Sequence, residues 1–202
     1  MTLYKGLYRI ESTRLPGWDY RNVGWYFVTI CTRDGYHFFG DVVNGEIQLS
    51  ALGEVAQRFW LEIPDHIAGV KTDACVVMPN HRHGILVVEP RPVAVVETLH
   101  TTSLQQQPPP PDDEFLTESQ IQSRAMSALS PKAGSLGAII RSYKSAVTNW
   151  AGLNGFRDFA WQPRYWDHII RDERSLHEIR QYIHDNPARC ELERQNPPAL
   201  RM

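Results

Sequence analysis

The chain has 202 residues, 42% hydrophobic and 22% charged, which excludes disorder throughout and fits one domain with an appendage. No stretch approaches the roughly 20 consecutive apolar residues of a membrane span, and the N-terminus lacks the apolar region of a secretory signal. We therefore expect a cytoplasmic protein with no membrane partner. The net charge of −2 argues against a nucleic-acid partner for the chain as a whole, but a basic surplus in residues 132–202 permits DNA there.

The first ninety residues begin with a strand, a short hairpin strand and a helix. Residues 25–32 (WYFVTICT) are rich in aromatic and β-branched side chains and predict a strand. Residues 47–49 follow an Asn-Gly pair and predict a short hairpin partner for this strand. Ser50 predicts the N-cap of a helix whose apolar residues recur at helical spacing until Pro64 ends it.

Two further apolar runs, residues 74–78 and 84–88, predict an antiparallel pair of strands. Residues 90–131 then hold seven of the 14 prolines, a run of glutamines and an acidic run, with little apolar periodicity. This composition predicts a flexible, disordered Pro/Gln-rich insertion. The parts on either side are small for separate domains, so we expect one domain over residues 1–202, interrupted at about 90–131.

The C-terminal part predicts a helix, a strand and a second helix. The helices cover residues 135–150 and about 173–185, the strand covers residues 165–170, and Asn186-Pro187 ends the second helix. The complete order is β, β, α, β, β, insertion, α, β, α. It predicts an α+β fold of the ferredoxin-like sandwich type, with an antiparallel sheet and helices on one face.

His81 and His83 are two apart at the start of a predicted strand. Their side chains therefore leave on the same face, about 6.6 to 7 Å apart at Cα, where both imidazoles can reach one divalent ion. Alternate polar residues are also what the solvent-facing side of a strand needs, and the spacing alone leaves that interpretation open.

Tyr182 and Asn186 lie four residues apart on the last predicted helix, so they share one helical face at about 5 to 6 Å. If this face meets the histidines, Asn186 completes a metal shell and Tyr182 points at a group that the metal holds. The alternative is a core tyrosine followed by an ordinary Asn-Pro stop signal.

Four motifs follow one another in the chain: MPNH-x-H after an apolar strand, SLGAIIRSYKSAVT, W-x-x-x-Y-W-D-H-I-I-R-D-E, and Y-I-x-x-N-P. In this order they resemble the REP-associated tyrosine transposases, relatives of the small insertion-sequence transposases of the HUH superfamily. The resemblance covers roughly residues 20–89 and 133–190. The chain departs from it in its long insertion and at Arg82, where relatives usually have an apolar residue. We expect Arg82 to point away from the metal face.

The resemblance implies a single HUH-type transposase domain that cuts and transfers single-stranded DNA containing hairpins through a covalent phosphotyrosine. It implies that His81 and His83 bind a divalent cation, Mg²⁺ or Mn²⁺, that Tyr182 is the nucleophile, and that Asn186 is a third ligand. Relatives include monomers and dimers, so a monomer or a homodimer is expected. His184 and His168 are candidates to assist loss of the phenol proton, although each also suits a surface or structural role.

Basic and aromatic side chains of the C-terminal part suit single-stranded DNA. We expect five basic residues to contact phosphates, and three aromatic residues are candidates for stacking on bases. A solvated helix face and a packed core explain the same residues equally well. The basic residues are Arg141, Lys144, Arg164, Arg171 and Arg174, and the aromatic residues are Trp161, Tyr165 and Trp166.

Three functions remain in competition at this point. The leading hypothesis is a metal-dependent endonuclease and strand transferase with Tyr182 as nucleophile. The second is a DNA-binding regulator that recognises repeat hairpins without cutting them. The third is a metal-dependent hydrolase that uses water, with Tyr182 in a structural role.

Overall fold

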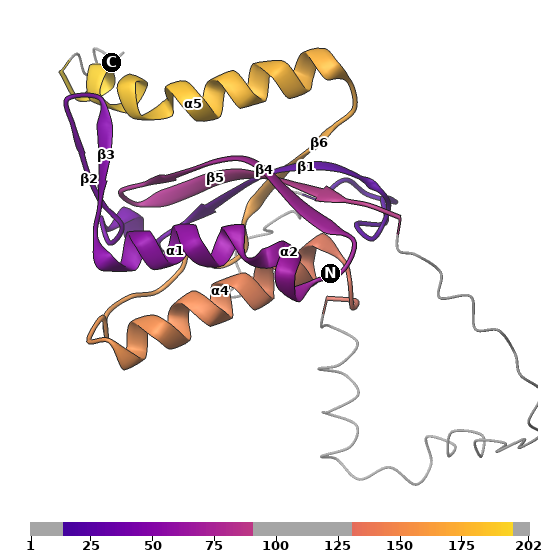
Figure 1. Ribbon diagram of the computed structural model, residues 1–202, viewed down its shortest axis with the longest axis horizontal. Coiled ribbons are helices and arrows are strands. Elements are labelled where there is room, and N and C mark those ends of the chain that lie inside the picture. Colours follow the sequence, from indigo (N-terminus) through magenta and orange to yellow (C-terminus); the bar gives the residue numbers. More distant parts are fainter. Residues whose placement is uncertain (1–13, 91–130, 196–202) are drawn as a thin grey trace, which may run out of the picture.

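The computed structural model describes residues 14–90 and 131–195, so nearly all of the predicted insertion lies outside the described residues. Its centre is a four-stranded antiparallel sheet (Figure 1). The strands lie in the order β4 (Val70–Met78), β5 (His81–Val88), β1 (Gly24–Cys31) and β6 (Trp166–Ile170). The predicted strands at 25–32, 74–78, 84–88 and 165–170 are all confirmed.

Two helices cover one face of this sheet, α1 (Ala51–Leu61) and α4 (Leu136–Leu153) (Figure 1). The chain therefore runs β1, α1, β4, β5, α4, β6, which is the order of a ferredoxin-like fold. This confirms the predicted α+β class with an antiparallel sheet. The N-cap of α1 is also as predicted, since the Gly53 amide donates to Ser50 Oγ at 3.1 Å. The short helix α2 (Ile63–His66) follows α1 and carries Pro64 in its first turn.

The last helix, α5 (Glu173–Gln195), lies across the opposite face of the sheet (Figure 1). The prediction that the helices share one face is correct for α1 and α4 and wrong for α5. The reason lies in β1, where residues of both faces are apolar, so that each face must be covered. Tyr26, Val28 and Ile30 pack with α1 and α4, whereas Phe27 packs with apolar residues of α5. Burial of each large apolar side chain contributes about 1.5 to 3 kcal/mol.

The prediction that α5 ends before Asn186-Pro187 is also wrong, since the helix continues through Pro187 to Gln195. A proline inside a helix removes one backbone hydrogen bond, so other contacts must support the C-terminal half of α5. One such contact comes from the turn at Gly45. A Cβ atom built on this glycine would lie 3.8 Å from Ala188 Cα, so the turn and the helix lie close together. None of the helices described is both long and apolar enough to cross a membrane.

Gly45 belongs to a separate two-stranded hairpin that rises beside the sheet to reach α5 (Figure 1). After a 3₁₀ turn, η1 (Arg33–Gly35), strands β2 (Gly40–Val43) and β3 (Glu46–Leu49) pair around Asn44 and Gly45. Both turn residues have positive φ, 54° and 78°, as a tight hairpin turn requires. The strand predicted at 47–49 is therefore confirmed, but it pairs with β2 and not with the strand at 25–32.

Candidate active site

The two histidines of β5 converge on the face of the sheet that α5 covers. His81 and His83 lie with their Nε2 atoms 3.1 Å apart and their ring centroids 4.6 Å apart. His83 is only 5% exposed. This argues against the interpretation in which the histidines only form the solvent-facing side of a strand. The shared face that the HxH spacing predicts is confirmed.

Neighbouring side chains fix the orientation of both imidazoles through their Nδ1 atoms. His83 Nδ1 lies 2.8 Å from Thr29 Oγ1, its cross-strand neighbour on β1. His81 Nδ1 lies 2.7 Å from Asn80 Oδ1, and because this amide oxygen only accepts, the His81 proton sits on Nδ1. The lone pair of His81 Nε2 then faces the site, as in metal-binding histidines whose other nitrogen is held by a polar partner.

Burial sets the charge of this pair. It lowers the pKa of His81 to about 4 and that of His83 to about 3, because removal from water disfavours the imidazolium. The neighbouring charges of His81 and Arg82 lower the pKa of His83 further. Both rings are therefore neutral near pH 7, the protonation state in which imidazole binds a metal ion.

Helix α5 brings Tyr182 to the same place, across about a hundred residues of sequence. The Tyr182 hydroxyl lies 3.3 Å from His83 Nε2, and the side chain is 36% exposed. Phe27 packs against both, with its ring 5.4 Å from that of His83 and 6.1 Å from that of Tyr182. A core tyrosine would be buried, so this position favours the interpretation in which the phenol faces a shared site.

Asn186 lies one helical turn after Tyr182 and is 8% exposed. Two imidazole nitrogens 3.1 Å apart suit neighbouring ligands of one ion at about 2.0 to 2.1 Å from each. Among the described residues, no group of three or more His, Cys, Asp and Glu side chains is arranged to hold a metal ion. The amide oxygen of Asn186 has the chemistry of a ligand for a hard cation.

Comparison with known proteins adds a relative and a fold. The chain is 34% identical over 182 residues to an uncharacterized protein of Haemophilus influenzae, and the match covers 90% of each chain. The chain belongs to the family of that protein. No protein-family model matches the chain.

Among solved structures, the fold is similar to that of a REP-associated tyrosine transposase bound to a REP hairpin. The TM-score is 0.52 at 18% sequence identity, with 90% of this chain and 74% of the other covered. A putative transposase from Deinococcus radiodurans gives a TM-score of 0.36 at 17% identity, with 85% and 95% covered. The first of these two similarities indicates a transposase-like fold for the chain.

The residues expected to contact phosphates are divided between two faces of this fold. Arg141 and Lys144 lie on α4, on the side of the sheet away from the histidines. Lys144 Nζ donates to the backbone carbonyls of Gln162 and Arg164, at 2.8 and 3.0 Å, and burial lowers its pKa to about 8. Lys144 therefore joins α4 to the segment before β6.

Arg164 and Arg171 lie just before and just after β6, and Arg174 lies on α5, across the sheet from α4. Arg164 has a φ of 68° in the loop before the strand. Arg171 follows the strand, and Arg174 Nε lies 2.9 Å from the Glu178 carboxylate on the exposed side of α5.

The aromatic candidates also differ in position. Trp161 is part of the core beneath the sheet, and its Nε1 donates to the Lys144 carbonyl. Tyr165 lies under the Arg14 guanidinium, 3.9 Å from its carbon. Trp166 is 47% exposed and lies on the histidine side of the sheet. His168 also faces that side from β6, whereas His184 pairs with Asp185 at 3.0 Å on the exposed side of α5.

Arg82 points away from the histidine face, as the strand alternation predicts. Its side chain is fully buried beneath the sheet, where it donates to the Ala56 carbonyl and lies 3.0 Å from the Tyr143 hydroxyl. Its guanidinium carbon is 3.9 Å from the centre of the Trp60 ring. The difference at this position from the transposases that the sequence resembles therefore concerns the core, and the two histidines still share the opposite face.

Arg189 lies near Tyr182 and has no counterpart among the residues predicted from the sequence. Its guanidinium lies 5.5 Å from the centre of the Tyr182 ring. The two residues are seven apart on α5, and this spacing places them on one helical face. The spacing is visible in the sequence, but a helix that is predicted to end before Pro187 does not include Arg189.

Proposed function

We propose that this protein is a metal-dependent enzyme that cuts single-stranded DNA next to a hairpin and rejoins it through a covalent bond to Tyr182. The observation that supports the proposal most directly is the arrangement of three groups. The Tyr182 hydroxyl lies 3.3 Å from His83 Nε2, which lies 3.1 Å from His81 Nε2. A nucleophile thus stands beside two neutral metal ligands at an open edge of the site.

The proposed chemistry is a transesterification. The Tyr182 phenol loses its proton, and its oxygen forms a bond to phosphorus while the bond from phosphorus to the 3′ oxygen breaks. The 3′ oxygen takes up a proton and leaves as a free hydroxyl. A 3′-hydroxyl of the same or another strand then attacks the phosphotyrosine and restores the phenol. Because the ester conserves the bond energy, the joining step needs no ATP.

His81, His83 and Asn186 are the residues that would hold Mg²⁺ or Mn²⁺. When bound, such an ion would act as a Lewis acid on the oxygens of the scissile phosphate. Other side chains of the protein hold these groups in position. Thr29 and Asn80 orient the imidazoles, and Phe27 keeps the Tyr182 ring beside His83.

DNA as the substrate is supported by the similarity in fold to a transposase that was solved with a REP hairpin. Single-stranded DNA fits best because a phosphate must reach Tyr182 Oη at the half-buried edge between α5 and the sheet. The protein is expected to act as a monomer or a homodimer.

The decisive test is the formation of a covalent adduct. Full-length protein is mixed with Mn²⁺ and labelled single-stranded oligonucleotides that contain hairpins, and the products are separated under denaturing conditions. We expect an adduct that depends on the metal and is lost in Tyr182→Phe and His81→Ala. Tyr36→Phe is the matched control, because Tyr36 is an exposed tyrosine outside the proposed machinery.

The other outcomes separate the competing functions. Hairpin binding without cleavage across a broad set of hairpins contradicts the proposal and favours the regulator. Cleavage products that carry no protein, with activity retained in Tyr182→Phe, contradict it in favour of a water-using hydrolase.

A further inference from the structure

A row of aromatic rings leads from the candidate site to the edge of the sheet. The Phe27 ring lies 5.4 Å from that of His83 and 5.6 Å from that of Trp166, which it meets edge to face. The Trp166 ring in turn lies 6.2 Å from that of His168, with the two planes within 7° of each other. The row therefore crosses from β5 over β1 to β6.

The outer end of this row is exposed to solvent. Trp166 is 47% exposed, whereas Trp60 is fully buried and Trp161 is 9% exposed. Trp166 and His168 are two residues apart on β6, so their side chains stand on one face of the strand that forms the sheet edge. An exposed indole with a parallel imidazole beside it offers flat apolar surface that the fold itself does not use.

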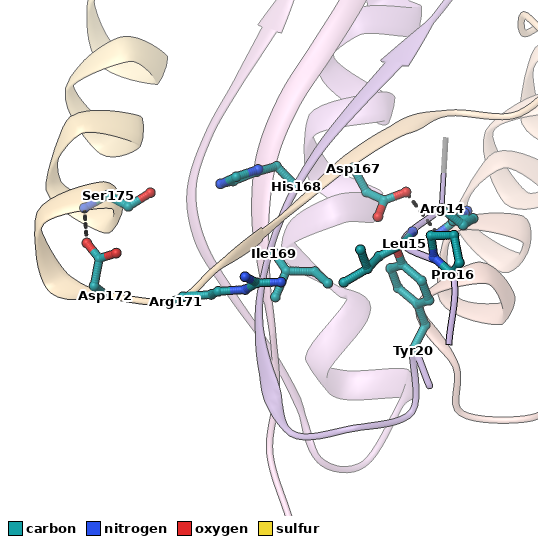
Figure 2. A pocket seen from close by; sticks show the side chains of 10 residues that line it. All are labelled: Arg14, Leu15, Pro16, Tyr20, Asp167, His168, Ile169, Arg171, Asp172 and Ser175. Atoms are coloured by element: carbon teal, nitrogen blue, oxygen red, sulfur yellow. Dashed lines mark hydrogen bonds and ion pairs between the residues drawn. The ribbon is translucent and has the colours of Figure 1, made fainter. Parts of the chain in front are cut away.

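Basic charge lies where the row ends. His168 and Arg171 line a cavity of about 580 Å³ at the junction of β6 and α5 (Figure 2). Its acidic side chains already have partners, since Asp167 pairs with Arg14 at 3.0 Å and Asp172 accepts the Ser175 backbone amide at 2.7 Å. In Figure 2, His168 extends from β6 toward α5, and Asp167 extends the opposite way toward Arg14. In Figure 2 the Arg171 side chain extends from the end of β6 toward Ile169, so it places a positive charge at the edge of the sheet just beyond His168.

We propose that Trp166 and His168 form a stacking platform for nucleobases of the single strand that passes from Tyr182 toward Arg171. This inference rests on the proposed function, because it takes the site at Tyr182 to act on DNA. Exposed flat rings that alternate with basic groups are the means by which proteins hold single strands without reading base edges. The platform would accept any base and would position the strand next to the scissile phosphate.

The test is a binding measurement that needs no chemistry. Full-length Tyr182→Phe protein without added metal is titrated with labelled oligothymidylate and with an abasic strand of the same length. Trp166→Ala should weaken binding of oligothymidylate roughly tenfold and leave binding of the abasic strand unchanged. Trp166→Phe should keep most of the affinity, since the benzene ring still stacks.

Three further variants calibrate this result. Arg171→Ala should weaken binding of both strands by the same factor and flatten the salt dependence, as loss of a phosphate contact does. Trp150→Ala is the matched aromatic control, because Trp150 lies on α4 beneath the sheet, and it should leave both affinities unchanged. His168→Ala changes an exposed side chain, so it tests the platform even if the Trp166→Ala protein does not fold. It should weaken binding of oligothymidylate less than Trp166→Ala does and leave binding of the abasic strand unchanged.

The platform would be overturned if proteins with Trp166 and with Trp166→Ala bound oligothymidylate with equal affinity. It would also be overturned if Trp166→Ala weakened binding of oligothymidylate and of the abasic strand by the same factor. Either result leaves the proposed function standing if the protein with Tyr182 still forms the covalent adduct. Absence of the adduct, with oligothymidylate bound through Trp166, would overturn the proposed function and retain the platform.

Discussion

Asp73 on β4 and Arg180 on α5 join the sheet to the helix that carries Tyr182. Arg180 donates two hydrogen bonds to the Asp73 carboxylate, at 2.8 and 2.7 Å. The pairing of β4 with β5 shifts register between Thr72 and Cys75, so Asp73 lies in a bulge, and bulges re-aim side chains. The carboxylate can therefore reach α5 while Ala74, the next residue, packs into the apolar layer beneath the helix.

This pair predicts a specific dependence of stability on pH. The hydrogen bonds from Arg180 hold the pKa of Asp73 below its usual value, so the ionised carboxylate stabilises the folded state. The contribution is complete above the pKa of Asp73 in the unfolded chain, near 4, and is lost as the pH falls through the lower pKa of the folded state. Because the pair is partly exposed, we expect about 0.5 to 1 kcal/mol.

The measurement is urea unfolding of the native protein and of Asp73→Asn across a range of pH. The difference in the free energy of unfolding should be constant from pH 7 to about pH 5 and should shrink in more acidic buffer. A difference that grows as the pH falls would contradict the assignment. Asp41→Asn serves as the control, because Asp41 is an exposed carboxylate on the separate hairpin.

The hydroxyl of Thr29 should matter for metal binding more than for folding. Thr29→Val keeps the shape of the side chain and removes the partner of His83 Nδ1, which lies 2.8 Å away. Loss of such a supporting hydrogen bond typically lowers metal affinity about 10- to 100-fold. Titration with Mn²⁺ by calorimetry should show this loss in Thr29→Val and recovery in Thr29→Ser.

Thr148→Val is the matched control for this experiment, since the Thr148 hydroxyl bonds to the Lys144 carbonyl on the far side of the sheet. It should leave the affinity for Mn²⁺ unchanged. Native affinity in Thr29→Val would show that His83 needs no support from its neighbour.

Arg82 should be replaceable by an apolar residue of similar length. Its Nε and Nη2 atoms are buried and have no hydrogen-bond partner within the described part of the chain. Arg82→Met removes these groups, and the Ala56 carbonyl keeps the hydrogen bond that the Tyr143 hydroxyl donates at 2.9 Å. We therefore expect a free energy of unfolding within about 1 kcal/mol of the native value, or above it.

Arg82→Ala leaves a cavity at the same position and should lower the free energy of unfolding by about 2 to 5 kcal/mol. Thermal and urea unfolding of the two variants check the contrast. If Arg82→Met is destabilised as much as Arg82→Ala, the guanidinium itself stabilises the core despite its two unpaired nitrogens, and the prediction is wrong.

The sequence is sufficient to place His81 and His83 on one face, because that depends only on the alternation of a strand. The meeting of Tyr182 with this pair depends on which face of the sheet α5 covers. That choice follows from Phe27 and the apolar residues of α5 packing together, which no local pattern records. The same limit explains Thr29, whose contact with His83 is set by the register between β1 and β5.

The predicted end of α5 is wrong for a different reason. Asn186-Pro187 is a common local stop signal, and here tertiary contacts override it. The turn at Gly45 meets Ala188 just beyond the proline, and Gly45 lies more than 140 positions away along the chain. With the helix continued, Arg189 is brought back to the ring of Tyr182.

Arg189 should therefore contribute to the rate of adduct formation. Its guanidinium lies 5.5 Å from the centre of the Tyr182 ring, where a positive charge favours the phenolate and an approaching phosphate. Removal of a dedicated donor from a closed site costs about 100- to 1000-fold in rate, and screening by solvent reduces this at an exposed position. Arg189→Ala should slow single-turnover adduct formation about 10- to 100-fold, and Arg189→Lys should recover part of the loss. Arg58→Ala, on α1 at the far side of the sheet and near Glu62, should react at the native rate, and an equal loss in both variants would indicate a general effect of charge on DNA binding.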